Sequence, residues 1–90
     1  MTMTDRIARR LEDGLLAAQV EVIDESHKHA GHVGARPEGE THFRLKIVSA
    51  HFSGKRSVER HRMVYELLSA EIADGVHALA MTTLTPEENR

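Results

Sequence analysis

The chain has 90 residues, of which 40% are hydrophobic and 29% are charged, and its formal net charge is −2. This length and composition are typical of one folded domain with a modest core, and they exclude a disordered chain. Because there is no cysteine, a disulfide framework and a metal site built from the chain's own thiolates are also excluded. With this slightly acidic balance, any nucleic-acid contact must depend on a local basic patch.

The chain also lacks the apolar stretches that a signal peptide or a membrane span requires. We therefore expect a single domain over residues 1–90 that is cytoplasmic and not bound to a membrane. The unusual feature of the composition is seven histidines, against two phenylalanines, one tyrosine and no tryptophan. Imidazole is a frequent metal ligand, so this surplus is the first functional indication.

The first element in chain order is a helix, predicted over residues 2–18, with Thr2 or Thr4 as its N-cap. Apolar residues recur along it with helical spacing, and the expected core-facing stripe is Ile7, Ala8, Leu11, Leu15 and Leu16. Gly14 lies inside this segment and weakens the helix, since glycine costs about 1 kcal/mol relative to alanine.

Two strands are predicted next, over residues 19–25 and 41–49, because apolar and polar residues alternate in both. Phe43, Leu45 and Ile47 share one face of the second run. Residues 26–39 separate the two runs and contain three histidines, three glycines and a proline without apolar periodicity. They predict a long, flexible, histidine-rich loop joining an antiparallel pair, and loops of this length are usually functional or mobile.

The second half of the chain predicts a tight turn, a long helix and a third strand. The turn covers residues 50–56, where Gly54 supplies a permissive backbone position. The helix covers residues 57–73 and the strand residues 76–84, with Gly75 ending the helix. The expected core-facing stripe of the helix is Val58, His61, Tyr65, Leu68 and Ile72. The order helix, strand, strand, turn, helix, strand favours a three-stranded sheet with two helices packed on one face.

Several stretches together resemble the BolA family. They read VIDESHKHAGH, GETHFRLKIVSAHFSGK, VERHRMVYELLSAEI and GVHALAMTTLTPEE, and they follow one another over nearly the whole chain. The resemblance implies an α/β fold with class II KH-like topology, which agrees with the element order above. It also implies an adaptor that is not an enzyme. BolA-like proteins associate with monothiol glutaredoxins, which hold a two-iron two-sulfur cluster with their own cysteine and that of bound glutathione.

The resemblance further implies which residues serve that cluster. In the mixed heterodimer the BolA-like partner supplies the histidine of a VHA segment, here His77, and a ligand from the long loop. His29 is the best positional match in the loop, with His27 and His32 as rivals. The implied role is iron–sulfur trafficking and iron-status regulation, and we expect the protein alone to be a monomer or a weak dimer.

From the residues alone, these histidines allow other interpretations. A single histidine such as His77 is more often a hydrogen-bonded structural residue, so its ligand role depends on the resemblance. The loop histidines lie within six residues of one another and could converge on one metal. They could equally form a solvated polar loop, or a zinc or nickel site on the protein alone.

A basic segment follows the predicted turn, with one acid, Glu59, among its cations. Its candidate contact residues are Gly54, Lys55, Arg56, Arg60 and Arg62. Backbone N–H groups at a helix N-terminus favour anions, although the Gly-x-x-Gly of KH domains is absent. We expect a dock for the acidic, glutathione-bearing surface of a glutaredoxin; the alternatives are a solvated face or a DNA-binding transcriptional regulator that contacts phosphates. No arrangement of catalytic residues is present, so no enzyme is expected.

Overall fold

The computed structural model describes residues 2–25 and 41–89. In chain order its elements are α1 (Met3–Leu15), β1 (Gln19–Asp24), β2 (His42–Val48), the 3-10 helix η2 (Ala50–Phe52), α2 (Ser57–Leu67), α3 (Ser69–Ala73) and β3 (Ala78–Leu84). The strand order is β1-β2-β3, with β1 antiparallel and β3 parallel to β2. The predicted fold class is confirmed. The predicted histidine-rich loop lies outside the described residues.

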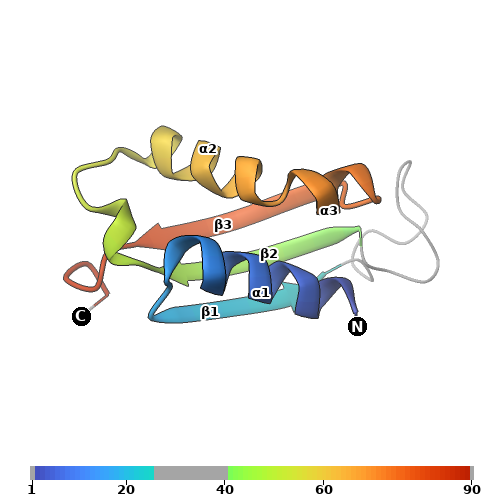
Figure 1. The fold of residues 1–90 in the computed structure, drawn as a ribbon, viewed down its shortest axis with the longest axis horizontal. Helices are drawn as coiled ribbons and strands as arrows, with labels where there is room; N and C mark the ends of the chain where they lie inside the picture. The colour runs from blue at the N-terminus through green and yellow to red at the C-terminus, as the bar shows by residue number, and fades with distance from the viewer. Residues whose placement is uncertain (1, 26–40, 90) are drawn as a thin grey trace.

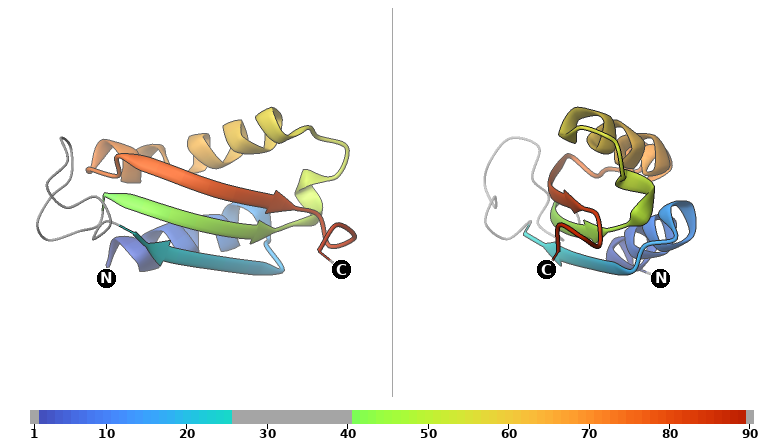
Figure 2. Two further views of the ribbon diagram at one scale, coloured as in Figure 1. Left: turned by 180° about the vertical axis from the view of Figure 1, so that it is seen from behind. Right: turned by 90° about the vertical axis from the view of Figure 1, so that its left-hand side faces the viewer.

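The described elements form two layers. Figure 1 shows α1 and the α2–α3 pair on one face of the sheet, and Figure 2 shows that no described helix covers the other face. The core lies between the layers and is built from fully buried apolar side chains, which include Ile7, Leu11, Leu15, Phe43, Leu45, Ile47, Phe52, Val64 and Leu68. None of the described helices has the length and hydrophobicity that crossing a bilayer requires.

Helix α1 begins as predicted and ends earlier than predicted. Thr2 caps it, because its Oγ1 accepts a hydrogen bond from Asp5 N at 3.1 Å while the Asp5 carboxylate accepts one from Thr2 N at 3.2 Å. The helix stops at Leu15, since Leu16 takes the left-handed conformation with φ 46°. The Leu16 side chain is 73% exposed, so its predicted place in the apolar stripe is wrong. The early stop lets the chain turn back, and Ala18 N already donates to Val48 O at 2.8 Å.

The predicted long helix is interrupted at Leu68, which separates α2 from α3. The predicted stripe is wrong for Val58 and Tyr65, which are 51% and 45% exposed, whereas Leu68 is buried as expected. The buried face is rotated by about one residue and consists of Arg60, Val64, Leu68 and Glu71. Two of these four are charged, so a search for apolar periodicity favoured the wrong face.

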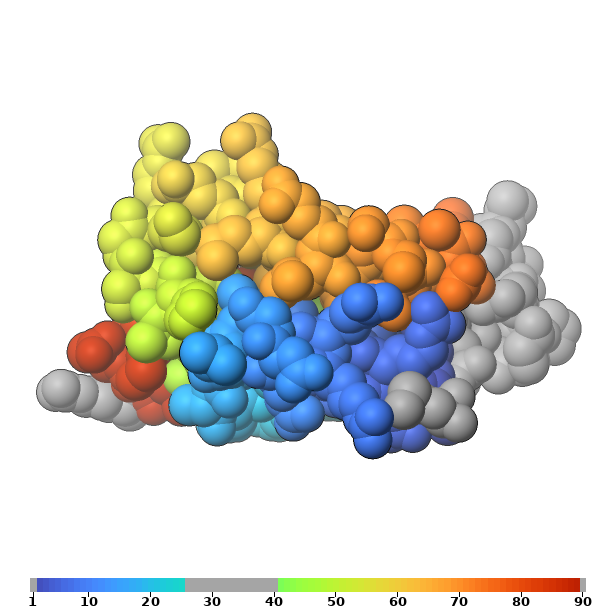
Figure 3. Space-filling view, in the orientation of Figure 1, coloured from blue at the N-terminus to red at the C-terminus, as the bar shows by residue number. Residues whose placement is uncertain are grey.

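Gly14 allows α1 to approach α2 closely. A Cβ atom built on Gly14 would lie 2.5 Å from Leu67 Cδ2, well inside van der Waals contact. Figure 3 shows the resulting contact between α1 and the α2–α3 pair along the helical layer. The presence of a glycine inside α1, unfavourable for the helix itself, is therefore explained by the close packing of Leu67 against it.

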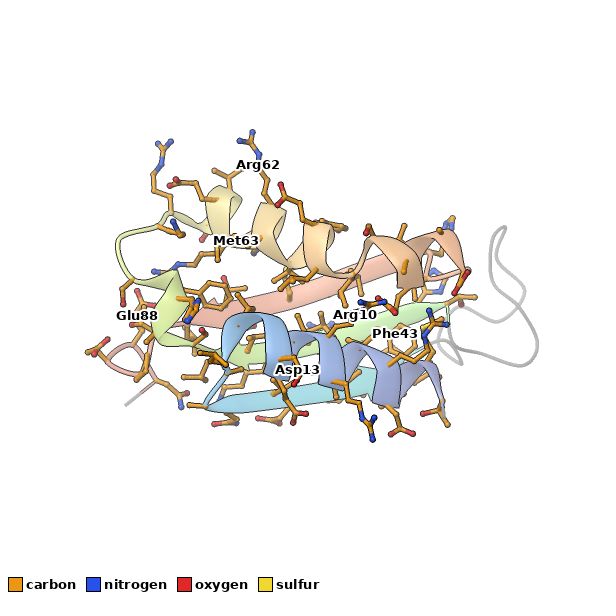
Figure 4. All side chains as sticks on the ribbon, in the orientation of Figure 1. Arg10, Asp13, Phe43, Arg62, Met63 and Glu88 are labelled. Atoms are coloured by element: carbon orange, nitrogen blue, oxygen red, sulfur yellow. The ribbon has the colours of Figure 1, made fainter. Side chains whose placement is uncertain are left out.

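Buried Glu71 joins α1 to α3. Its side chain is 1% exposed, and its carboxylate accepts from Arg6 Nη2 and Arg10 Nε, each at 3.1 Å. Arg6 also pairs with Asp74 at 2.7 Å on the surface. The hydrogen bond to Asp74 is the main reason that the pKa of Arg6 is raised above its ordinary value. Figure 4 shows Arg10 reaching from α1 towards α3. Because both guanidinium groups reach solvent, the buried carboxylate is compensated without burying a cation.

Buried Arg60 plays the corresponding role at the opposite end of the sheet. Its guanidinium donates to Lys55 O at 2.8 Å, to Thr83 O at 2.9 Å and to Glu88 Oε1 at 2.7 Å. It also lies 5.7 Å from the centre of the Phe52 ring. The hydrogen bond from Arg60, with a second one from the backbone of Thr85, lowers the pKa of Glu88 to about 2. Arg60 thereby fastens the turn before α2 to the end of β3.

The hydrogen bonds of buried Glu71 predict that its loss destabilises the fold much more than the loss of the neighbouring acid Asp74. Glu71→Ala removes a buried acceptor shared by two arginines and should lower the free energy of unfolding by roughly 2–3 kcal/mol. Asp74→Ala removes only an exposed ion pair and should cost less than about 1 kcal/mol. Urea unfolding of both variants measures this, and similar losses would contradict the assigned role of Glu71.

The Glu88 interaction predicts a pH dependence. Its folded-state pKa lies below its ordinary value of 4.5, at about 2, so the carboxylate stabilises the fold above pH 4.5 and this contribution is lost as the pH falls from there towards 2. Glu88→Gln should therefore flatten the decline in urea midpoint between pH 5 and pH 3 relative to the unsubstituted protein. Parallel declines for the two proteins would show that the Arg60–Glu88 pair carries no such linkage.

Candidate functional site

His77 lies at the rim of the sheet, immediately before β3. The preceding residue, Val76, is 4% exposed and anchors the segment in the core, whereas His77 itself is exposed. The Thr41 carbonyl accepts from His77 N at 2.6 Å and from Ala78 N at 3.1 Å. The structure thus places an accessible imidazole on a backbone that is held at two consecutive positions.

The same end of the sheet contains the two ends of the histidine-rich segment. β1 runs out at Asp24 and β2 begins at His42 beside the start of β3 (Figure 1). Glu25 N donates to His42 O at 2.8 Å, closing the pair there. Thr41 and His42, which follow the segment, are therefore in contact with His77, and Glu25, which precedes it, is bonded to His42. His27, His29 and His32 themselves lie outside the described residues.

A second imidazole, from His42, lies next to His77. The two ring centroids are 5.4 Å apart and the ring planes are tilted by 56°. His42 is 9% exposed, and its Nδ1 lies 2.8 Å from Thr41 Oγ1 in a hydrogen bond. The sequence analysis missed this residue, because alternation placed it on the polar face of β2. The signal that would have found it is the parallel register, which sets His42 opposite Ala78.

A shallow depression adjoins His42 on the uncovered face of the sheet. Its volume is about 250 Å³, and its lining includes Glu25, Arg44, Ala78 and Ala80. Arg44 Nε donates to Glu25 Oε2 at 3.0 Å along one side. The small alanine side chains leave room beside the His42 imidazole for a group brought by a partner.

The described residues contain no group of three metal-ligating side chains close enough to hold an ion. One exposed imidazole with a neighbouring imidazole is an incomplete ligand set for a metal centre. The full sequence has no thiolate to complete it. A metal or cluster at this end would need ligands from the undescribed segment or from another protein.

The basic turn lies at the far end of the sheet from His77. Gly54 has φ +77°, a backbone conformation that favours glycine. Lys55, Arg56 and Arg62 are exposed, and Figure 4 shows Arg62 pointing away from the body of the molecule. The Arg56 side chain is 85% exposed and lies 3.6 Å from Glu59.

Arg60 differs from the other cations of this segment. Because it is buried and bonded to two carbonyl groups and Glu88, it supports the turn from within. Its predicted place among the surface contact residues is therefore corrected to a structural one. The candidate contact surface is reduced to Gly54, Lys55, Arg56 and Arg62.

The two candidate sites are separated by the length of the sheet. β2 has seven residues, which span about 20 Å at ~3.3 Å per residue. Ala78, the residue after His77, is level with the first of these residues, and the basic turn follows η2 beyond the last. Substitutions at one site should leave the other intact, so the functions expected of them can be tested separately.

The chain is similar to a known protein family in both sequence and structure. The model of the family described as BolA-like protein matches residues 11–88. The BolA domain of SufE1 from Arabidopsis thaliana, a solved structure, superposes with a TM-score of 0.88 at 45% identity, covering 98% of this chain and 96% of that one.

Two curated relatives differ in length and in the function that they are named for. SufE-like protein 1, chloroplastic/mitochondrial, of Arabidopsis thaliana is 47% identical over 87 residues, which are 92% of this chain and 24% of that protein. This chain therefore spans only about a quarter of that relative. The DNA-binding transcriptional regulator BolA of Escherichia coli is 39% identical over 88 residues, covering 98% of this chain and 80% of that protein. With its fold, its matched residues and these similarities together, the chain belongs to the BolA family.

Proposed function

We propose that this chain is a non-enzymatic adaptor that forms a heterodimer with a monothiol glutaredoxin. In that complex His77 and a histidine of the undescribed segment are ligands of a two-iron two-sulfur cluster shared with the glutaredoxin and its glutathione. His29 is the preferred second ligand, and His27 and His32 remain its rivals. The role served is iron–sulfur trafficking and iron-status regulation.

The observation that carries the proposal is the presentation of His77. A ligand for a shared cluster must reach beyond its own protein and must be held in one place. His77 meets both requirements, because it is exposed while Thr41 O fixes its own backbone N–H and that of Ala78. The flanks of the histidine-rich segment meet at the same rim, which suits a second ligand from that segment.

The donor set also supports a shared rather than a resident cluster. The chain offers nitrogen donors and no thiolate, so the partner must supply the sulfur ligands. In Rieske-type centres, histidine in place of cysteine raises the reduction potential of a two-iron two-sulfur cluster. An adaptor of this kind would therefore change the redox and transfer properties of a cluster that a glutaredoxin otherwise holds with thiolates alone.

The second candidate function is DNA binding by the basic turn. The observation that favours it is the exposure of Lys55, Arg56 and Arg62 around the left-handed Gly54. The Escherichia coli relative is named as a DNA-binding regulator, and three cations at one end can neutralise backbone phosphates. The same cations could dock an acidic glutaredoxin surface, and the two functions could belong to one protein.

His77→Ala tests the cluster ligand. The variant removes the exposed imidazole and should abolish the change in visible circular dichroism that the unsubstituted chain produces in a cluster-loaded monothiol glutaredoxin. His51→Ala is the matched control, because His51 is an exposed histidine on η2 at the other end of β2. If the His77 variant produced the same spectrum as His51→Ala, the ligand assignment would be wrong.

The double variant Lys55→Glu with Arg56→Glu tests the basic turn. On duplex DNA it should weaken binding about tenfold or more and reduce the slope of log affinity against log salt by about 2. The glutaredoxin spectrum should persist if the turn serves DNA and weaken if it docks the glutaredoxin. Unchanged binding to both would leave the turn as a solvated basic face.

A further inference from the structure

We propose that His42 is a positioning residue that holds the His77 imidazole in its ligand orientation. The consequence for cluster binding rests on the function proposed above, whereas the contact between the two rings can be tested on the free protein. His42 would not itself bind iron; it would act through the neighbouring ring.

The first step is that Thr41 fixes both histidines. Its carbonyl accepts from the backbone N–H groups of His77 and Ala78, at 2.6 and 3.1 Å. Its hydroxyl lies in a hydrogen bond with His42 Nδ1 at 2.8 Å. Thr41 is 1% exposed, so this node is shielded from water. One buried residue therefore sets the positions of the His77 backbone and the His42 ring together.

The second step is that His42 is the more rigid of the two histidines. It belongs to β2, the central strand, which pairs with β1 on one side and β3 on the other. Its side chain is nearly buried, and its ring is hydrogen-bonded to its neighbour. The His77 ring, in contrast, is exposed and has no hydrogen bond or ion pair to any residue in the described part of the chain.

The third step is that the His42 ring limits the rotation of the His77 ring. A centroid separation of 5.4 Å with a 56° tilt lies within the range in which aromatic rings attract one another. An exposed side chain normally loses rotamer freedom when it binds, and ordering it beforehand improves affinity. Residues that orient a metal ligand typically change metal affinity 10- to 100-fold when they are replaced.

The free protein provides the direct test, by NMR at one fixed pH. The unsubstituted chain should show a nuclear Overhauser effect between the His42 and His77 ring protons. In His42→Leu, which keeps the apolar bulk but removes the ring, the His77 ring signal should move to the position of an unstructured histidine and sharpen. In His42→Phe, which keeps a ring, it should stay displaced. Absence of the Overhauser effect in the unsubstituted protein overturns the inference whether or not the variants fold.

The complex provides the functional test. With a cluster-loaded monothiol glutaredoxin, His42→Leu should bind about tenfold more weakly with a reduced circular dichroism signal, and His42→Phe should retain most of the affinity. Equal behaviour of His42→Leu and the unsubstituted chain, in an experiment where His77→Ala abolishes the signal, overturns the inference alone. A normal signal from His77→Ala overturns the proposed function. The NMR experiment on the free protein then still decides, independently, whether the His42 ring orders the His77 ring.

Discussion

The parallel pairing of β2 with β3 is the constraint on which both candidate sites depend. Two parallel strands cannot be joined by a hairpin, so the chain must cross over the sheet. The α2–α3 pair makes this crossover and covers one face (Figure 1). The crossover begins with the basic turn at the end of β2 and finishes with His77 at the start of β3. One topological requirement therefore puts the cations and the exposed imidazole at opposite ends.

Two buried charges hold this crossover in place. Arg60 ties its beginning to the end of β3, and Glu71 ties its end to α1. Each is neutralised by partners that remain partly in solvent, which avoids the desolvation of a complete ion pair. Stability and site geometry are thus coupled, because the groups that anchor α2 and α3 also set the position of the two candidate sites.

The element order and the sheet could be predicted from the sequence because alternation in β1 and β2 is clear, with Phe43, Leu45 and Ile47 all buried. The orientation of the α2–α3 pair could not be predicted in this way. Its inward face includes Arg60 of α2 and Glu71 of α3, while Val58 and Tyr65 remain exposed, so hydrophobic periodicity favoured the wrong side. A buried charge is recognisable only when its partner is known, and those partners lie far away in the chain.

In the candidate site, too, one residue could be predicted from the sequence and another could not. His77 was identified through the resemblance of its segment to a family, and its exposure is compatible with the ligand role predicted for it. His42 could not be found by that route, since nothing local distinguishes it from His51. Its place beside His77 results from the pairing of strands that are more than thirty residues apart, and strand register of this kind is set by tertiary structure.

The most direct measurement of the central claim is pulsed electron paramagnetic resonance of the reduced mixed cluster. This chain would carry ¹⁵N-labelled histidine and the glutaredoxin would be unlabelled. If a histidine of this chain is bonded to iron, strong nitrogen couplings should appear at ¹⁵N frequencies, and the His77 contribution should vanish in His77→Ala. A spectrum without histidine couplings, or one in which the nitrogen couplings do not shift to ¹⁵N frequencies when this chain is labelled, would show that the chain gives no ligand to the cluster.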